Sequence, residues 1–243
     1  MTIQSGAPDP ALVVLVRHGQ AAAPDRAGRY FSKAPVPLTE FGRHQAVQVG
    51  GFLQHLQVDA LYASDLLRAR QTAEIISTAV GMPVRYDDRL REVDTGDLDG
   101  STIEELQRAY PAFLPWVQAG FRQGFASNVN HFEVTLRFPG GECVLEAAER
   151  AVSAFRGICE RHSGSCVAIV SHAWVSSSIL CHVMDIPVDR YFRFGQVNAG
   201  ISILRAGMDG RGMLDGLNLS APLELLAGGS LPLLDRATRG SDE

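Results

Sequence analysis

Two histidines that follow apolar, β-branched runs are the first candidates for chemistry. His18 comes soon after residues 11–16, and His172 comes soon after residues 166–170. Continuous runs of this kind are typical of buried parallel strands, whose carboxyl ends form one edge of a sheet. Ligands of open α/β sheets bind beyond that edge, so both imidazoles are expected there. A neutral imidazole in such a place can attack an electrophilic centre or bind an anion.

Two arginines are expected at the same edge of the sheet as these histidines. Arg17 precedes the first of these histidines, and Arg68 falls in the first turn of a helix predicted over residues 65–80. The helix macrodipole disfavours a cation there, whereas the amides of the same turn attract anions. A phosphate bound between the guanidinium and the amides would reconcile the two, and arginine binds phosphate in a bidentate manner. The alternative is a surface ion pair of Arg68 with Asp65 or Glu92.

The segment over residues 90–100 is rich in carboxylates and glycine, as expected of a loop. Protonation of a leaving-group oxygen needs a general acid. Glu92 is the best candidate because it ends a short stretch with apolar neighbours, away from the acidic tip. A solvated loop charge is the alternative for any one of these acids. There is no HExxH, no His-x-His and no P-loop motif, so we predict neither a metal nor a cofactor.

The composition limits the classes of partner. The chain has 243 residues with 22 Lys and Arg against 27 Asp and Glu, a net charge of -5. Proteins that bind nucleic acid present a basic face, so we expect no nucleic-acid partner. Lys33 is the only lysine among the cations. The arginine bias suits a small anionic substrate, although a preference for arginine codons would explain it equally well.

The cysteines and the amino-terminal run bear on the compartment. Four cysteines show no CxxC spacing, and Cys159 and Cys166 have the pattern of small buried hydrophobic residues in a reducing compartment. The apolar run over residues 11–16 is too short for a signal peptide or a membrane span. We therefore expect a cytoplasmic protein with no membrane partner.

Alternating strand and helix signals predict an α/β fold: a three-layer sandwich with a mostly parallel central sheet flanked by helices. Three helices have an apolar face at spacings of three and four. They are predicted over residues 39–56 with Thr39 as the N-cap, over 65–80 with Ser64 as the N-cap and Gly81 as the stop, and over 142–162.

We predict one domain over residues 1–243, with an inserted cap segment over residues 101–138 and a mobile tail over residues 230–243. The inserted segment is rich in aromatic residues and contains Pro111 and Pro115. It is either a lid over the substrate or a satellite core, and the lid is favoured. A hairpin is expected after residue 205.

Taken together, seven segments resemble the histidine phosphatase superfamily, the phosphoglycerate-mutase-like group, in the order in which that family has them. They cover most of the chain from residue 12 to about residue 205 and are highly specific as a set. The segments are LVRHGQ (15–20), LTEFGRHQA (38–46), YASDLLRARQTA (62–73), LREVDTGDLDG (90–100), PGGE (139–142), VSHA (170–173) and NAGISIL (198–204).

The resemblance implies phosphoryl transfer, and we predict a phosphatase that hydrolyses small phosphate monoesters without a metal. His18 would be the nucleophile that forms a phosphohistidine, and Glu92 would be first the general acid and then the general base. The family is often dimeric, so a homodimer is an open expectation. The residues implied to contact the substrate are Arg17, Gln20, Arg68, His172 and Ala173.

Three departures from the family pattern and two rival functions remain, and one of the departures is Ala173, where the family often has glycine. Many members have Ser or Thr and then Asn where this chain has Ala21 and Pro24, which costs about 1 kcal/mol of phosphate binding for each lost contact. A weakly active phosphoryl-binding domain is therefore one alternative. A phosphoglycerate mutase is the other, but the inserted segment offers only Arg108, Arg122 and Arg137 for a substrate carboxylate. This favours a phosphatase acting on a less charged or apolar ester.

Overall fold

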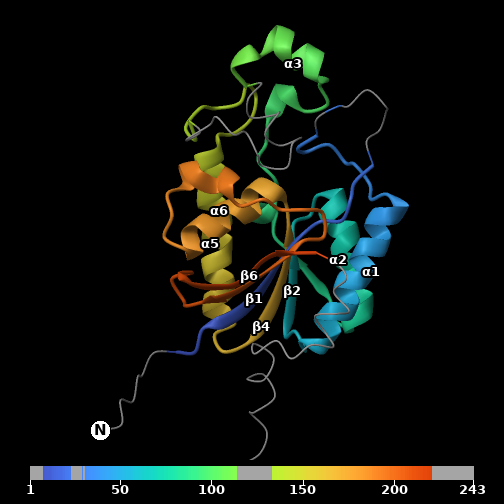
Figure 1. Ribbon diagram of the computed structural model, residues 1–243, viewed down its shortest axis with the longest axis vertical. Coiled ribbons are helices and arrows are strands. Elements are labelled where there is room, and N and C mark those ends of the chain that lie inside the picture. Colours follow the sequence, from blue (N-terminus) through green and yellow to red (C-terminus); the bar gives the residue numbers. More distant parts are fainter. Residues whose placement is uncertain (1–7, 23–28, 30, 114–132, 221–243) are drawn as a thin grey trace, which may run out of the picture.

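The computed structural model describes residues 8–22, 29, 31–113 and 133–220. It is an α/β sandwich in which a six-stranded sheet lies between two pairs of helices (Figure 1), so the predicted fold class is confirmed. The sheet is mixed, because β5 runs antiparallel to both of its neighbours. The spatial order is β3-β2-β4-β1-β5-β6. The strands are β1 (Ala11–Arg17), β2 (Ala60–Ala63), β3 (Val84–Tyr86), β4 (Cys166–Ser171), β5 (Ile201–Ala206) and β6 (Gly212–Leu219).

The central strand β1 supplies side chains to both apolar layers. Val13 and Leu15 pack in the cluster that includes α5 (Val144–Arg161) and α6 (Ala173–Val183). Val14 and Val16 pack in the cluster that includes α1 (Glu40–His55) and α2 (Leu67–Val80). Alternate residues of a strand face opposite sides of a sheet, so a strand covered on both sides is apolar throughout.

Two of the predicted helix boundaries are correct and two are wrong. Thr39 caps α1, since its side chain accepts a hydrogen bond from the Gly42 amide, and Gly81 ends α2 in a left-handed conformation. Ser64 is not the N-cap of α2; the cap is Leu66, which gives no side-chain hydrogen bond. The third helix begins at Val144, two residues later than predicted. Its N-cap is Cys143, whose amide donates to the Glu146 carboxylate.

The described part of the inserted segment forms a third apolar cluster. It contains α3 (Ile103–Ala109) and a short 3₁₀ turn (Pro111–Phe113). Figure 1 shows α3 at the end of the molecule toward which the parallel strands run. A satellite core is therefore present, and the lid remains a prediction, since residues 114–132 lie outside the described residues, as do residues 230–243. The side chains of the cluster include Leu106, Phe113, Phe138, Trp174 and Tyr191.

The four cysteines are free and buried. Burial raises the pKa of the Cys159 and Cys166 thiols to about 12, so both remain protonated at neutral pH. The sequence prediction of small buried hydrophobic residues is confirmed for these two.

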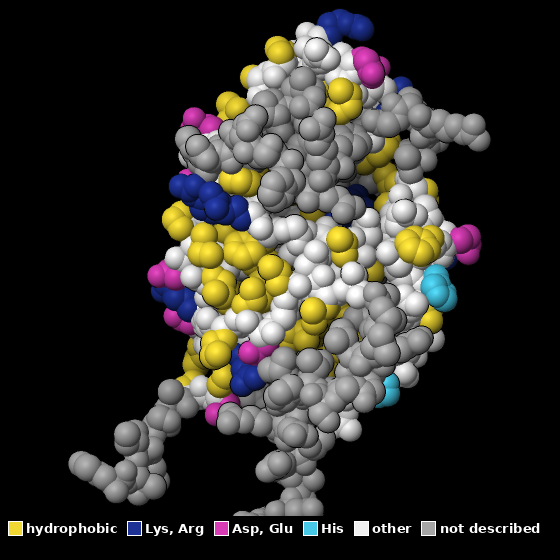
Figure 2. All heavy atoms as spheres, in the orientation of Figure 1, with side chains coloured by type: hydrophobic (Ala, Val, Ile, Leu, Met, Phe, Trp, Pro, Cys, Tyr) yellow, Lys and Arg dark blue, Asp and Glu magenta, His cyan; other side chains and the backbone are white. Residues whose placement is uncertain are grey.

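The surface differs in character from one side to the other. Figure 2 shows apolar side chains gathered over α6 and β6, and β6 contributes the exposed Met213 and Leu217. Cyan histidine side chains show at the edge over α1, which carries the exposed His44 and His55. Among the described residues, no helix has the length and hydropathy that a membrane crossing requires.

Helix α1 packs directly on the loop after β1 through two glycines. A Cβ atom on Gly42 would lie 2.0 Å from the Gln20 carbonyl oxygen. A Cβ atom on Gly19 would lie 2.4 Å from the Gly42 carbonyl oxygen. These backbone segments approach more closely than any side chain permits.

We predict that Gly42→Ala lowers the free energy of unfolding by about 1–3 kcal/mol, because the added methyl group must displace the backbone. Gly51→Ala in the same helix is the matched control, since its Cβ meets no atom within 4 Å. The control should be neutral or up to about 1 kcal/mol more stable, because alanine has the better helix propensity. Urea unfolding measures both; equal stability of the two variants would contradict the packing argument.

Candidate active site

The carboxyl ends of three neighbouring strands meet at one edge of the sheet. The His18 amide, after β1, donates to the Ser171 carbonyl oxygen at 3.0 Å. The Ser64 amide, after β2, donates to the Val170 carbonyl oxygen at 3.0 Å. His172 follows β4 and is the N-cap of α6. These contacts bring together segments that are far apart in the chain.

The His18 side chain is buried and held in one tautomer. Its Nδ1 lies 2.8 Å from the Gly19 carbonyl oxygen, which can only accept, so Nδ1 carries the proton. The lone pair of Nε2 accepts a hydrogen bond from Arg68 Nε at 3.2 Å. Burial, followed by the charges of Arg68 and Arg17, lowers the pKa of His18 well below 6.5. The ring is therefore neutral at neutral pH and has the lone pair that a nucleophile needs.

The second imidazole lies beside the first. The ring centroids of His18 and His172 are 5.1 Å apart. His172 Nε2 lies 2.8 Å from Ser64 Oγ, and its buried Nδ1 has no hydrogen-bond partner among the described residues. Burial, followed by the charge of Arg68, lowers the pKa of His172 well below 6.5. Since a hydrogen bond spans about 3 Å, both rings can contact the same tetrahedral anion.

The two arginines lie against this pair of rings. Arg68 is buried and donates from its Nη2 to the Ser32 carbonyl oxygen at 2.5 Å. The alternative of a surface pair with Asp65 or Glu92 is wrong, because the Arg68 side chain is buried, and Asp65 is bound by Arg91. Arg17 donates to the Gln196 carbonyl oxygen, and its buried Nε has no partner among the described residues.

Burial lowers the pKa of Arg17 to about 10, with a smaller opposing effect from Glu92. The guanidinium therefore remains charged at neutral pH. A partly buried cation with a buried, unused donor favours an anion at this place.

Glu92 lies at the side of the same site. Its Oε2 accepts a hydrogen bond from the Trp174 amide at 3.3 Å, in the first turn of α6. Its Oε1 accepts from the Val93 amide at 3.1 Å. The side chain is half-buried, so it keeps some access to solvent. This combination suits a group that must exchange a proton with both substrate and water.

Arg17, His18, Arg68 and Glu92 line one cavity of about 250 Å³, and the fully buried His172 lies next to it against the His18 ring. Gln20 and Ala173 also face the cavity, and the Gln20 side chain accepts a hydrogen bond from Thr39 Oγ1 at 2.9 Å. The structure thus places the predicted site residues at one edge of the sheet, all but His172 in the lining of this cavity. Among the described residues, no group of three or more His, Cys, Asp or Glu could hold a metal ion. The lining is Arg17, His18, Gln20, Ala21, Ala22, Arg29, Phe31, Val36, Arg68, Glu92, Ala173, Trp174 and Asn198.

Sequence reasoning missed three side chains that support the site. Ser64 contacts His172, Thr72 Oγ1 accepts a hydrogen bond from the Gly19 amide at 3.0 Å, and Asn198 donates to the His18 carbonyl oxygen at 3.2 Å. All three lie in segments that carried the family resemblance, and that position was the available signal.

Comparison with known proteins agrees with this geometry. Residues 13–218 match the histidine phosphatase superfamily (branch 1). The chain belongs to the histidine phosphatase superfamily. The match covers both histidines, both arginines and Glu92. The resemblance deduced from the sequence is therefore confirmed.

Relatives of this superfamily member fall into two groups by name. A protein of Salmonella choleraesuis named probable phosphoglycerate mutase GpmB is 31% identical over 190 residues, which are 78% of this chain and 82% of that protein. The structure of a mycobacterial glucosyl-3-phosphoglycerate phosphatase is 26% identical with a TM-score of 0.70, covering 86% of this chain and 99% of the other. YhfR of Bacillus stearothermophilus is 26% identical with a TM-score of 0.72, covering 88% and 98%. Family and neighbours together support an enzyme of the phosphatase and mutase class.

We predict that neither buried histidine takes up a proton as the pH falls through 6.5, whereas both do so in the unfolded chain. The unfolded state then binds more protons, so stability falls on acidification below pH 6.5. His172→Gln should reduce this loss by about 1.4 kcal/mol per pH unit between roughly pH 5 and 6.5. Urea unfolding against pH measures the slope, and NMR titration of the rings in folded and urea-unfolded protein is the control. A His18 ring that titrates near 6.5 in the folded protein would contradict the prediction.

Proposed function

We propose that this protein is a metal-independent phosphatase that hydrolyses small phosphate monoesters through a phosphohistidine on His18. One observation carries the proposal: the neutral imidazole of His18 lines a cavity together with two guanidiniums and a carboxylate, and a second neutral imidazole lies against it with the ring centroids 5.1 Å apart. Cations hold the phosphoryl oxygens, a neutral imidazole attacks, and a carboxyl group exchanges the proton.

The reaction has two steps. His18 Nε2 attacks phosphorus in line, the bond from phosphorus to the ester oxygen breaks, and Glu92 gives its proton to the departing oxygen. The Glu92 carboxylate then takes a proton from water, which attacks the phosphohistidine and releases inorganic phosphate. Arg17, Arg68 and His172 bind the oxygens in both steps, in agreement with the general rule that phosphoryl transfer depends on positioning and charge.

The lining of the cavity favours hydrolysis over mutase activity. Beyond Arg17 and Arg68, the described lining offers one more cation, Arg29, which pairs with Glu105 at 3.3 Å. A mutase needs further cations for the substrate carboxylate. Of the arginines in the inserted segment, Arg137 pairs with Glu146, Arg108 is exposed, and Arg122 lies outside the described residues. Apolar side chains line much of the remaining cavity, namely Ala21, Ala22, Phe31, Val36, Ala173 and Trp174.

The proposed intermediate can be tested directly. Rapid acid-free quenching of the protein with an aryl phosphate, followed by intact-protein mass spectrometry and peptide mapping, should find one acid-labile, alkali-stable phosphate on His18. His18→Ala should abolish both the adduct and turnover, because it removes the nitrogen that attacks phosphorus in the proposed reaction. Arg68→Met should lower kcat/KM by about 10³-fold, as for other cations at a transferring phosphoryl group. An adduct on another residue, or turnover by His18→Ala, would refute the assignment.

The choice between phosphatase and mutase has a separate test. With 3-phosphoglycerate and its bisphosphate, release of inorganic phosphate should exceed formation of 2-phosphoglycerate. A chelator such as EDTA should leave the rate of hydrolysis unchanged. Isomerisation faster than hydrolysis would favour the mutase, and activity lost to EDTA and restored by a divalent cation would disprove the metal-independent mechanism.

A further inference from the structure

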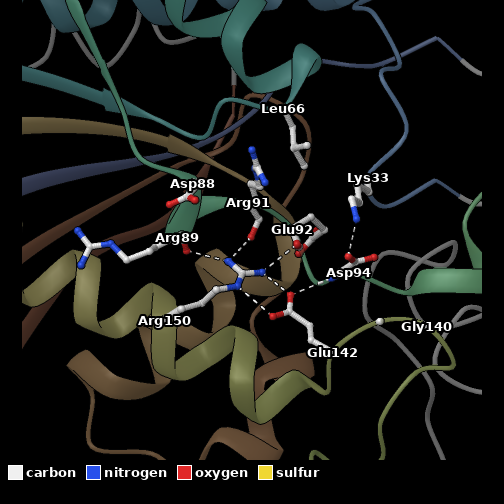
Figure 3. Close-up of a pocket in the computed structure, with 11 residues that line it drawn as sticks. Lys33, Leu66, Asp88, Arg89, Arg91, Glu92, Asp94, Gly140, Glu142 and Arg150 are labelled. Carbon is white, nitrogen blue, oxygen red and sulfur yellow. Dashed lines mark hydrogen bonds and ion pairs between the residues drawn. The ribbon is translucent and has the colours of Figure 1, made fainter.

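A second cavity, of about 380 Å³, lies beside the active site and shares Glu92 with it (Figure 3). Charged side chains of both signs surround it. At its centre, Figure 3 shows Arg150 of α5 pointing at the backbone of the segment over residues 89–94, with Glu142 next to it. The cavity is lined by Lys33, Leu66, Asp88, Arg89, Arg91, Glu92, Asp94, Gly140, Gly141, Glu142 and Arg150.

All five N–H donors of Arg150 are in use. Three go to backbone carbonyl oxygens: those of Arg89 at 2.7 Å, Arg91 at 2.7 Å and Glu92 at 2.9 Å. Two go to the Glu142 carboxylate, from Nε at 3.1 Å and from Nη2 at 2.5 Å. A planar guanidinium has five donors in a fixed geometry, so this set of contacts fixes its orientation completely.

Glu142 extends the same contacts to the other side of Glu92. Its Oε1 accepts a hydrogen bond from the Asp94 amide at 2.9 Å, and its own amide donates to the Asp94 carbonyl oxygen at 2.9 Å. The turn before it permits this approach, because a Cβ atom on Gly141 would lie 2.2 Å from the Asp94 carbonyl oxygen. The Arg150–Glu142 pair therefore holds the backbone both before and after Glu92.

The pair is partly buried, with side-chain exposures of 23% for Arg150 and 19% for Glu142. Removal of the guanidinium would leave three carbonyl oxygens without their hydrogen-bond donor. The backbone could then rearrange so that these oxygens accept hydrogen bonds from other donors. A small rotation at Glu92 would be enough to move its carboxylate away from the Trp174 amide and from the substrate. A displacement of about 1 Å at a catalytic group can cost roughly 10²-fold in rate.

We propose that Arg150, oriented by Glu142, is a positioning residue for the general acid: it holds the backbone at Glu92 so that the carboxyl group faces the leaving-group oxygen. This inference rests on the proposed function. Lysine cannot replace Arg150, since an ammonium has three donors on one nitrogen and cannot reach three carbonyl oxygens and a carboxylate together.

The test compares kcat/KM for two esters in the same protein. An alkyl phosphate has a poor leaving group that needs the proton from Glu92, whereas 4-nitrophenyl phosphate has a good leaving group that needs it little. Because kcat/KM covers the steps up to formation of the phosphohistidine, the ratio of the two values isolates proton donation. The ratio does not depend on the fraction of folded protein, so a less stable variant remains informative.

Arg150→Lys and Glu142→Gln should each lower kcat/KM for ethyl phosphate by about 10²-fold and for 4-nitrophenyl phosphate by no more than roughly threefold. Glu92→Gln should show the same selectivity with a loss of about 10²–10⁴-fold on ethyl phosphate. Arg205→Lys is the matched control. Its guanidinium pairs with Asp215 at 2.7 Å between β5 and β6, with exposures of 32% and 10%, and it should change neither value.

The outcomes separate the two proposals. Suppose that the wild type is active and that both variants lower kcat/KM for the two esters by the same factor, or not at all. The ratio of the two kcat/KM values is then unchanged, Arg150 and Glu142 are structural only, and the positioning role is refuted. If the wild type hydrolyses neither ester, the proposed function fails and the positioning role fails with it. A loss of kcat/KM that is selective for the alkyl ester in both variants, with the control variant unchanged, supports the positioning role.

Discussion

The His18 ring lies between the Gly19 carbonyl oxygen, which takes the proton of Nδ1, and the Arg68 guanidinium, which faces the lone pair of Nε2. A neighbouring cation and burial both oppose a charge on the imidazole. The same groups that would bind a phosphoryl anion in the proposed reaction therefore also keep the His18 ring unprotonated. The remaining features of the site follow from this requirement, since two guanidiniums, one buried and one partly buried, lie beside a ring that carries no charge.

Such a cluster is stable only where rigid elements position it. The rings of His18 and His172 stand at the ends of parallel neighbours in the sheet, β1 and β4, and Arg68 stands in the first turn of α2. Backbone amides of the first turn of α6 complete the surroundings, since one of them holds Glu92. The two histidines and the two arginines thus stand at strand ends or a helix start, where the backbone itself contributes dipoles that favour an anion, and Glu92 approaches them from a loop.

Much of this arrangement could be predicted from the sequence, because it depends on local patterns. The apolar runs before His18 and His172 identify the strands, and their shared edge places the two rings together. What could not be predicted depends on partners far away in the chain. Ser64 has the residue type of an N-cap, but its hydroxyl group contacts His172 and the helix begins without it.

Glu142 fails as a predicted helical residue for the same reason. Its carboxylate binds Arg150 and the Asp94 amide, and α5 begins only after it. Asp65, an alternative partner considered for Arg68, is bound by Arg91 instead. In each case the polar side chain could have bonded a partner nearby in the sequence but bonds one that is distant in the sequence and close in the fold. Helix propensities contain no information on such distant partners.

Because β1 contributes side chains to both apolar layers, an error in the pairing register of this strand would also affect activity. A slip of one residue in the pairing of this strand would exchange the side chains meant for opposite layers, and it would also turn the residue that follows the strand away from its partners. Sheet assembly and catalytic competence therefore share a single register. A misaligned molecule could not retain partial turnover, so specific activity would report the fraction of chains whose central strand is correctly paired.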